Sequence, residues 1–269
     1  MIVVGLAQDK AIFDSLNAMN EQHDLCLDLS WQPLAKTNQA SLMGVSGAAR
    51  IFVGIIKNTP MLLCYTSDDK YQHYEMIKTF PNWESLTRRV ITAGRKSELL
   101  LQACKLLPEK TVIDGTAGFG HDSLILASTG ASVTMLEQNP LMFLLLTYEM
   151  QKMQANPNWQ KLLSRMTLHH GNATEILPTL ANADVVYLDP MFPDDSYKSA
   201  QVGKQMQVLH TLACPPTPEQ ARELLSMAKN QLTPSGRVVV KRPKIAPYLA
   251  DVTPQASWQN AVIRYDGYF

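Results

Sequence analysis

The chain has 269 residues, of which 46% are hydrophobic and 18% charged, which fits one large domain or one domain with a smaller companion and excludes a disordered chain. Lys and Arg together number 24, as do Asp and Glu, so the formal net charge is zero. A protein that holds nucleic acid by bulk charge alone is thereby excluded, although a local basic face is not.

No segment of the sequence has the features of a membrane anchor, a secretion signal or a zinc site. The longest apolar runs, such as residues 141–146, are far shorter than a bilayer requires. The N-terminus lacks the basic segment that opens a signal peptide. The cysteines form no CxxC pair and have no histidine cluster at zinc spacing. These features predict a cytoplasmic protein with neither a membrane partner nor a metal ion.

Residues 1–85 are predicted to form a small α/β region. They contain two short apolar runs, at residues 51–56 and 61–65, and one possible amphipathic helix over residues 10–21. These signals are too short to assign a topology or a role to the region.

From residue 86 onward, short β-rich runs alternate with helical stretches. This alternation is typical of a parallel sheet with helices on both faces, and it predicts a Rossmann-like α/β domain over residues 86–269. Helix starts are marked by Asn139-Pro140 and by a capping box at Thr217 and Gln220. The predicted elements are strands at 111–114, 131–137, 166–169, 184–189, 237–241 and within 261–269, helices at 97–107, at 121–129, from 140 and from 217, and a turn at 234–236.

A glycine-rich turn follows the first predicted strand of this domain. Gly115, Gly118 and Gly120 come directly after Asp114, in the spacing GxxGxG. Glycines let the backbone approach a ligand closely, and open parallel sheets bind ligands just beyond the carboxyl ends of their strands. The dinucleotide fingerprint is GxGxxG, so the turn taken alone is also compatible with a plain tight turn.

Acidic and small polar residues follow the next two predicted strands. Glu137 lies 23 residues beyond Asp114, near the ~20-residue offset at which a carboxylate binds the hydroxyl pair of a ribose. Asn172 and Ala173 form a small turn that can approach an adenine edge. Taken alone, these are also the features of a solvated strand end and an ordinary loop.

The run Asp189-Pro190-Met191-Phe192-Pro193 after the fourth strand is the most specific feature of the sequence. Its prolines stiffen the backbone, which a plain connection does not need. Asp189 and a fixed backbone carbonyl can bind the two hydrogens of an exocyclic amine, and Phe192 can stack on the base. The run therefore predicts a catalytic corner made by Asp189, Pro190 and Phe192, with a proline-rich loop capped by an aspartate as the plainer alternative.

Four segments carry further motifs: VIDGTAG at 112–118, MLEQNP at 135–140, VVYLDPMFP at 185–193 and VVVKRP at 238–243. Together they resemble the ribosomal RNA small subunit methyltransferase J family over roughly residues 86–269. The resemblance implies the class I fold of S-adenosylmethionine-dependent methyltransferases, with methionine in place of the second proline of a (D/N)PP(F/Y) tetrapeptide. It also implies methyl transfer to the exocyclic N2 of one guanine in 16S ribosomal RNA.

The resemblance further implies a set of contacts with S-adenosylmethionine. Several family members have Arg where this chain has His121 and Gln138, and Ser-Ser where it has Asn172 and Ala173. Asp122, at a helix start, is expected to hold the methionine end of the cofactor or the glycine-rich turn. The expected cofactor contacts are Asp114, Gly115, Gly118, His121, Asp122, Glu137, Gln138, Asn172, Ala173 and Asp189.

Basic residues gather in two groups, one near residues 88–96 and one along 237–244, and two lysines follow the proline-flanked corner. With zero net charge, this clustering predicts a local basic face that contacts RNA, with solvated helix and strand ends as the alternative. The resemblance names 16S ribosomal RNA or the 30S subunit as the partner. The expected RNA contacts are Arg88, Arg89, Arg95, Lys96, Lys198, Lys204, Lys241 and Arg242.

Three other functions stay open on the sequence alone. A nicotinamide-dependent oxidoreductase would use a similar sheet, but its GxGxxG motif is missing and the Asp-Pro-Met-Phe run would have no role. A methyltransferase could act on another exocyclic amine of RNA or DNA, and a non-catalytic RNA-binding assembly factor could keep the same fold. The sequence does not indicate an oligomeric state.

Overall fold

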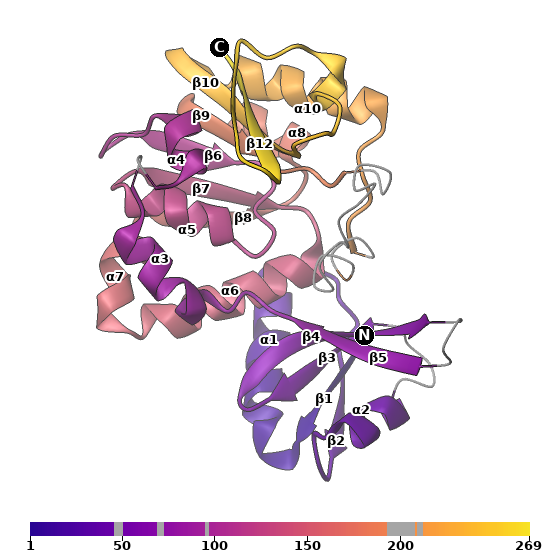
Figure 1. The fold of residues 1–269 in the computed structure, drawn as a ribbon. Coiled ribbons are helices and arrows are strands. Elements are labelled where there is room, and N and C mark those ends of the chain that lie inside the picture. The colour runs from indigo at the N-terminus through magenta and orange to yellow at the C-terminus, as the bar shows by residue number, and fades with distance from the viewer. Residues whose placement is uncertain (46–50, 69–72, 95–96, 193–207, 209–211) are drawn as a thin grey trace.

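Two β-sheets organise the chain, and each draws on a separate stretch of the sequence (Figure 1). Residues 2–79 supply a five-stranded sheet, and residues 111–268 supply a seven-stranded sheet. The predicted α/β fold class is confirmed. The computed structural model describes residues 1–45, 51–68, 73–94, 97–192, 208 and 212–269.

The smaller sheet combines a parallel part and an antiparallel part. Its strands are β1 (Ile2–Leu6), β2 (Ser30–Leu34), β3 (Ile51–Ile56), β4 (Thr59–Asp68) and β5 (His73–Thr79). They lie in the order β2-β1-β3-β4-β5, with β1 parallel to both of its neighbours and the other pairs antiparallel. Lys57 and Asn58 connect β3 to β4 with positive φ, the conformation that suits the twist of a two-residue hairpin.

The helix predicted over residues 10–21 is confirmed as α1 (Lys10–Gln22). A second helix, α2 (Gln39–Val45), follows β2. Phe13 of α1 and Leu42 of α2 belong to different buried clusters. Because successive residues of a strand point to opposite faces, the two helices cover opposite faces of the smaller sheet.

The larger sheet is parallel apart from its last strands. It contains β6 (Thr111–Asp114), β7 (Ser132–Glu137), β8 (Met166–His170), β9 (Ala183–Leu188), β10 (Leu232–Pro243), β11 (Ala256–Gln259) and β12 (Ile263–Tyr268). The strand order is β11-β12-β10-β9-β6-β7-β8; β12 pairs antiparallel with β10 and β11, and the other pairs among these described strands are parallel. The predicted parallel sheet, with further strands in the tail, is confirmed.

Two predicted elements differ from the structure. The turn predicted at residues 234–236 lies within β10, because the pairing with β9 changes register before Arg237 and so accommodates the proline. The helix predicted over residues 97–107 is the shorter α4 (Leu99–Cys104). Lys105 ends it early, because its φ of 50° is left-handed and cannot continue a helix.

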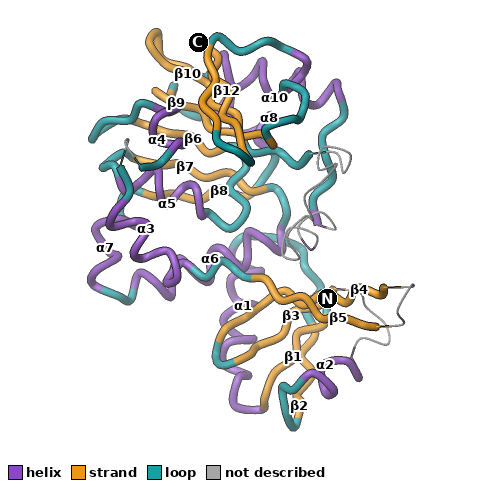
Figure 2. Tube along the Cα trace, viewed as in Figure 1, coloured by secondary structure: helices purple, strands orange, loops and turns teal. Residues whose placement is uncertain are grey.

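Helices cover both faces of the larger sheet (Figure 2). The helices are α3 (Thr87–Thr92), α5 (His121–Ser128), α7 (Pro157–Leu163), α8 (Ala173–Ile176) and α10 (Pro218–Asn230). On one face α4, α5 and α7 pack around Trp83, and on the other face α8 and α10 pack together. The predicted capping box of α10 is confirmed, since Thr217 and Gln220 bond to each other's backbone amides.

Helix α6 (Pro140–Gln154) lies between the two sheets (Figure 1). The side chain of Asn139 accepts two backbone amides of the first turn at 3.0 Å each, which confirms the predicted cap. The helix is apolar almost all round. Leu145 packs into the core of the smaller sheet, whereas Leu146 packs into that of the larger one. The two parts of the chain therefore share buried surface along α6.

The residues that the structure describes contain no helix long and apolar enough to cross a membrane. Across the same ranges, no three His, Cys, Asp or Glu side chains are grouped as metal ligands would be. Cys64 and Cys104 are buried, whereas Cys26 and Cys214 are exposed.

Candidate active site

The carboxyl ends of the central strands meet at one edge of the larger sheet. From β6 the chain continues through β7 and β8 to one side, whereas β9 and β10 lie on the other side. The strand order therefore reverses between β6 and β9, and open parallel sheets bind ligands at such a switch point. Asp114 ends β6 and Asp189 follows β9, so both predicted acidic residues lie there.

The turn after β6 needs glycine at three positions. Gly120 has a φ of +70°, and a Cβ there would lie 2.9 Å from the Trp83 side chain. A Cβ on Gly115 would lie 2.8 Å from Cδ2 of Leu188 on the neighbouring strand. Gly118 has a φ of +58°, which residues with a side chain rarely adopt. The amide of Gly115 donates to the carbonyl of Tyr187 at 2.9 Å. The glycine-rich sequence thus makes a tight turn that is hydrogen-bonded to β9 at the switch point.

The Asp114 side chain organises this turn from the inside. It is 1% exposed, and its two oxygens accept the amide of Thr116 at 3.1 Å and the hydroxyl of Ser123. Burial raises the pKa of Asp114 to about 7, although both hydrogen bonds act in the opposite direction. Both carboxylate oxygens of Asp114 are bound, one to the turn and one to α5, and its predicted contact with the cofactor stays a prediction.

The raised pKa of Asp114 predicts that the folded state loses stability as the pH rises. The group binds more protons in the folded state, where its pKa is about 7, than in the unfolded state, where it is about 3.9. The free energy of unfolding therefore falls with rising pH between these values. We expect Asp114 to lower the free energy of unfolding by about 3 kcal/mol between about pH 5 and about pH 8.

Urea unfolding of the wild type and of Asp114→Asn at these two pH values measures that contribution. The asparagine keeps the shape of the side chain but does not titrate, so the fall should be smaller in the variant. An equal fall in both proteins would contradict the assignment.

Glu137 ends β7 and faces the same turn. It is 7% exposed, and its two oxygens accept the amides of Gly118 at 2.8 Å and Asn139 at 2.7 Å. Burial raises the pKa of Glu137 to about 7. Each carboxylate oxygen can accept a further hydrogen bond beyond these, so the group still has capacity for hydroxyl donors of a ligand.

The other predicted cofactor residues lie around this edge in different environments. Gln138 and Asn172 are exposed, and Asn172 caps α8 with its side chain. Ala173 is buried next to the glycine-rich turn. A ring nitrogen of His121 lies within hydrogen-bonding distance of the carbonyl oxygen of Pro81. The structure therefore gives His121 a partner in the segment that precedes the larger sheet.

The corner after β9 is joined to the glycine-rich turn. The amide of Asp189 donates to the hydroxyl of Thr116, and Pro190 is buried. Phe192 is 7% exposed, and the guanidinium of Arg242 lies 4.8 Å from the centroid of its ring, a cation–π contact. One face of the ring thus already has a partner within the protein, and stacking of Phe192 on a base stays a prediction.

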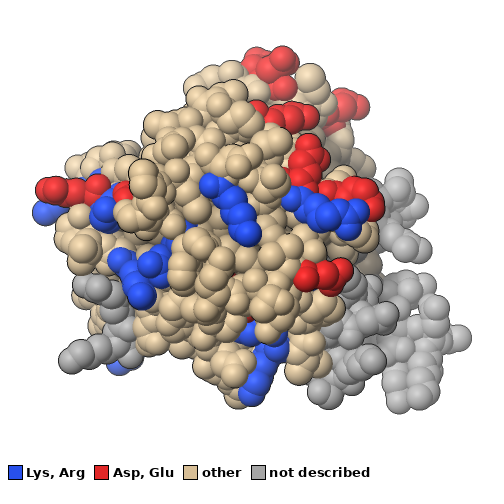
Figure 3. Space-filling view, turned by 90° about the horizontal axis from the view of Figure 1, so that it is seen from above, with Lys and Arg blue, Asp and Glu red and all other residues tan. Residues whose placement is uncertain are grey.

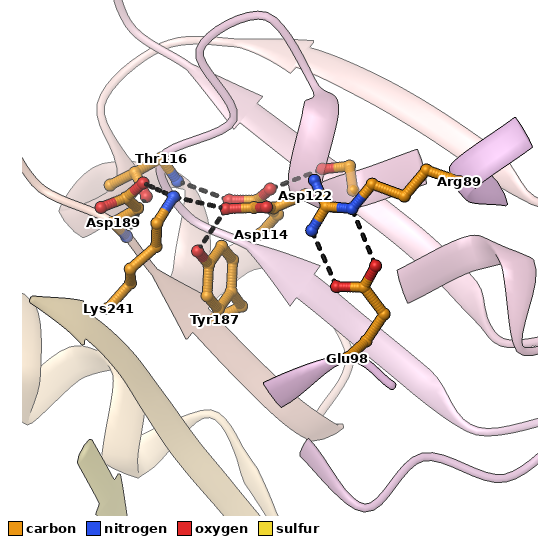
Figure 4. Close-up of polar contacts among 9 residues, drawn as sticks. Arg89, Glu98, Asp114, Thr116, Asp122, Tyr187, Asp189 and Lys241 are labelled. Atoms are coloured by element: carbon orange, nitrogen blue, oxygen red, sulfur yellow. Dashed lines mark hydrogen bonds and ion pairs between the residues drawn. The ribbon is translucent and has the colours of Figure 1, made fainter. Parts of the chain in front are cut away.

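Lys241 links the two sides of the switch point through ion pairs (Figure 4). Its ammonium lies 2.8 Å from Oδ2 of Asp122 on α5 and 2.8 Å from Oδ2 of Asp189. The hydroxyl of Tyr187 donates to the same oxygen of Asp122 at 2.7 Å. Desolvation opposes the charge of Lys241, but the two carboxylates together raise its pKa well above the usual value. Asp122, a predicted cofactor contact, is therefore a partner of Lys241.

The structure separates the predicted RNA-binding residues. Arg242 is only 6% exposed and donates to a backbone carbonyl, while Lys241 is bound by the two aspartates. These two side chains are thus bound to groups of the protein itself, and their predicted contact with RNA stays a prediction. Arg88 and Arg89 are exposed on α3, with Arg89 paired to Glu98 at 2.8 Å.

Viewed from above, the described Lys and Arg side chains form separate small groups rather than one continuous patch (Figure 3). Four of the predicted RNA contacts, Arg95, Lys96, Lys198 and Lys204, lie outside the described residues. Their role stays a prediction from the sequence.

Comparison with known proteins decides the family. A family model described as "Putative SAM-dependent methyltransferase" matches residues 52–269. A ribosomal RNA small subunit methyltransferase J from Psychrobacter arcticus is 46% identical over 275 residues, which cover 95% of this chain and 90% of that protein. The chain belongs to the ribosomal RNA small subunit methyltransferase J family. Another relative of that name, from Acinetobacter baumannii, is 35% identical over 79% of each chain.

A solved structure agrees with this fold. The crystal structure of a SAM-dependent methyltransferase from Neisseria gonorrhoeae matches 100% of this chain and 95% of its own, with a TM-score of 0.67 at 24% identity. The cofactor of this methyltransferase J family member is S-adenosylmethionine, as predicted. The site fits that group, because the turn at Gly115 has no room for a side chain and Glu137 retains hydrogen-bonding capacity.

Three residues of the site are not singled out by the sequence. Thr116 binds the Asp189 corner, Ser123 binds Asp114, and Tyr187 binds Asp122. A signal existed for Tyr187, which carries the one hydroxyl in the apolar run at residues 185–188 of β9 and therefore needs a buried partner. In this methyltransferase J family member, Thr116 joins the ends of β6 and β9, whereas Ser123 and Tyr187 join those strands to α5.

Proposed function

We propose that the protein transfers the methyl group of S-adenosylmethionine to the exocyclic N2 of a guanine in 16S ribosomal RNA. The names of the relatives support the RNA class. The Asp189 corner supports an amine as the methyl acceptor. Its backbone is bound to Thr116 of the glycine-rich turn, and its carboxylate lies at the switch point. An amine whose lone pair is delocalised into a ring is a weak nucleophile, and a carboxylate that binds its hydrogens favours attack.

The chain's own residues would hold the cofactor around the glycine-rich turn. S-adenosylmethionine, when bound, supplies a methyl group made electrophilic by a sulfonium. The Glu137 carboxylate would accept hydrogen bonds from the ribose hydroxyls, and the backbone at Gly115 and Gly118 would lie against the amino-acid end of the cofactor. Asn172 and Ala173, after β8, would lie beside the adenine. The burial of Glu137 supports this role, since a carboxylate held by two amides has a fixed direction.

The proposed step is a direct displacement. The bound cofactor would supply the methyl carbon to the amine nitrogen, and its sulfur would leave with the electron pair of the broken carbon–sulfur bond. The methylated nitrogen is then cationic and strongly acidic, and it passes one proton to the Asp189 carboxylate. Alignment of the reacting atoms and exclusion of water supply most of the acceleration, so no covalent intermediate with the enzyme is required.

RNA contacts are proposed on the exposed basic side chains. Arg88 and Arg89 lie on α3, and Lys244 is exposed just beyond β10. Such side chains bind phosphates without reading sequence. A guanine in a paired or stacked site would have to be extruded to reach Asp189.

The test is transfer of labelled methyl from S-adenosylmethionine to 30S subunits and to naked 16S ribosomal RNA, both from cells that lack the protein. We expect one labelled guanine, located at N2 by mass mapping. Label on the exocyclic amine of another base would overturn the guanine assignment. Cofactor binding by calorimetry without any transfer to either substrate would instead favour a non-catalytic assembly factor.

A further inference from the structure

Lys241 lies inside the site although its sequence context suggests an exposed strand end. Its side chain is 24% exposed, and those of Asp122 and Asp189 are 16% and 25% exposed. Taking three charges from water is costly unless they are well paired. The three groups come from α5, from the end of β9 and from β10, so the pairing is assembled by the fold and not by neighbouring residues.

We propose that Lys241 is a positioning residue for methyl transfer: its ammonium, held by Asp122, keeps the Asp189 carboxylate ionised and directed toward the amine. This inference rests on the proposed function. The ammonium takes no proton itself. It stays charged while Asp189 accepts the proton that the methylated nitrogen releases, and Asp122 balances the ammonium afterwards.

The charges around Asp189 act in opposite directions. The pKa of Asp189 lies above its usual value, because burial raises it most, the ammonium of Lys241 lowers it, and the carboxylate of Asp122 raises it. Arg242 adds a smaller lowering effect. The titratable groups around Asp189 are Asp114 on β6, Asp122 on α5, Tyr187 on β9, Lys241 and Arg242 on β10, and Tyr265 on β12.

Two substitutions should therefore move the pH profile of transfer in opposite directions. Activity needs Asp189 ionised, so the rate falls as the pH drops through its pKa. Lys241→Met removes the stabilising cation, which should shift this acidic limb upward by about 1 to 3 pH units and lower kcat near neutral pH by about 10- to 100-fold. Asp122→Asn removes a competing carboxylate, so the limb should shift to lower pH. If Lys241 and Asp122 only stabilised the fold, the two substitutions would not shift the acidic limb in opposite directions.

The chain offers a matched control at the opposite end of the same central strands. Lys110 pairs with Asp184 at 2.8 Å, where β6 and β9 begin. Lys110→Met removes a lysine–aspartate pair far from the switch point, and we expect its acidic limb to coincide with that of the wild type. Lys241→Arg keeps the charge and should bring the limb back toward the wild-type position.

The experiment measures kcat against pH for wild type and variants on 30S subunits, with calorimetric S-adenosylmethionine binding and circular dichroism as separate readouts. Opposite shifts in Lys241→Met and Asp122→Asn, with cofactor affinity little changed, support the proposal. Shifts of the same sign, no shift, or loss of cofactor binding with an unmoved limb overturn it. If Lys241→Met does not fold, the sign of the Asp122→Asn shift decides. A wild type that methylates neither substrate defeats the proposed function itself, so the two failures are distinguishable.

Discussion

Replacing Asp189 with alanine is expected to abolish measurable methyl transfer while the protein stays folded. The amine loses the carboxylate that orients its hydrogens and accepts its proton, and removal of such a group typically lowers the rate by about 10²- to 10⁴-fold. The fold should survive because Lys241 keeps Asp122 as an ion-pair partner, so no buried ammonium is left unpaired. Initial rates on 30S subunits, with cofactor binding by calorimetry, measure the effect.

Asp184 provides the matched control for this prediction. It lies on the same strand as the corner but at the other end, where it pairs with Lys110 and accepts the amide of Thr111 at 2.9 Å. Asp184→Ala should lower thermal stability and leave the rate of transfer unchanged. Turnover close to the wild-type value in Asp189→Ala would remove that carboxylate from the mechanism.

Glu137→Ala is expected to weaken S-adenosylmethionine binding by about 100-fold, or about 3 kcal/mol. The substitution removes the acceptor proposed for the ribose hydroxyls. It also leaves the amide of Gly118 without its partner at 2.8 Å, so the glycine-rich turn loses a fixed position. Isothermal titration calorimetry with the cofactor and with its demethylated product measures the loss.

Glu149→Gln separates this effect from the general loss of a buried carboxylate. Glu149 is 2% exposed and accepts the amide of Trp83 at 3.0 Å, outside the switch point. Its variant should lose stability but keep its affinity for the cofactor. Equal weakening in the two variants would show that the glutamates act through the fold and not through the ribose.

Local signals explain which elements could be predicted from the sequence. The bounds of β6 and the caps at Asn139 and Thr217 agree with the structure, because a short apolar strand and a capping side chain involve residues close together in the chain. The sequence also predicts that Asp189 and Glu137 lie at one edge of the sheet, because the carboxyl ends of parallel strands share one edge. The structure confirms that position.

The rest depends on partners that are distant in the chain. Lys241 is separated from Asp122 by 119 residues and from Asp189 by 52, so no local pattern indicates that a lysine at a strand end faces inward. The topology of the smaller sheet depends likewise on pairing of β1 with strands that follow much later. The division of the chain near residue 85 stays a prediction, and the family match itself begins at residue 52.

The position of α6 has a practical consequence for anyone who wishes to study the catalytic part in isolation. A truncated polypeptide that starts at residue 86 would retain this helix but lose the strands that shelter Leu141, Met142 and Leu145. Exposed leucine and methionine side chains on one helix face form a hydrophobic patch that promotes self-association. Such a fragment should aggregate during expression, whereas in the intact chain these side chains are buried against the smaller sheet.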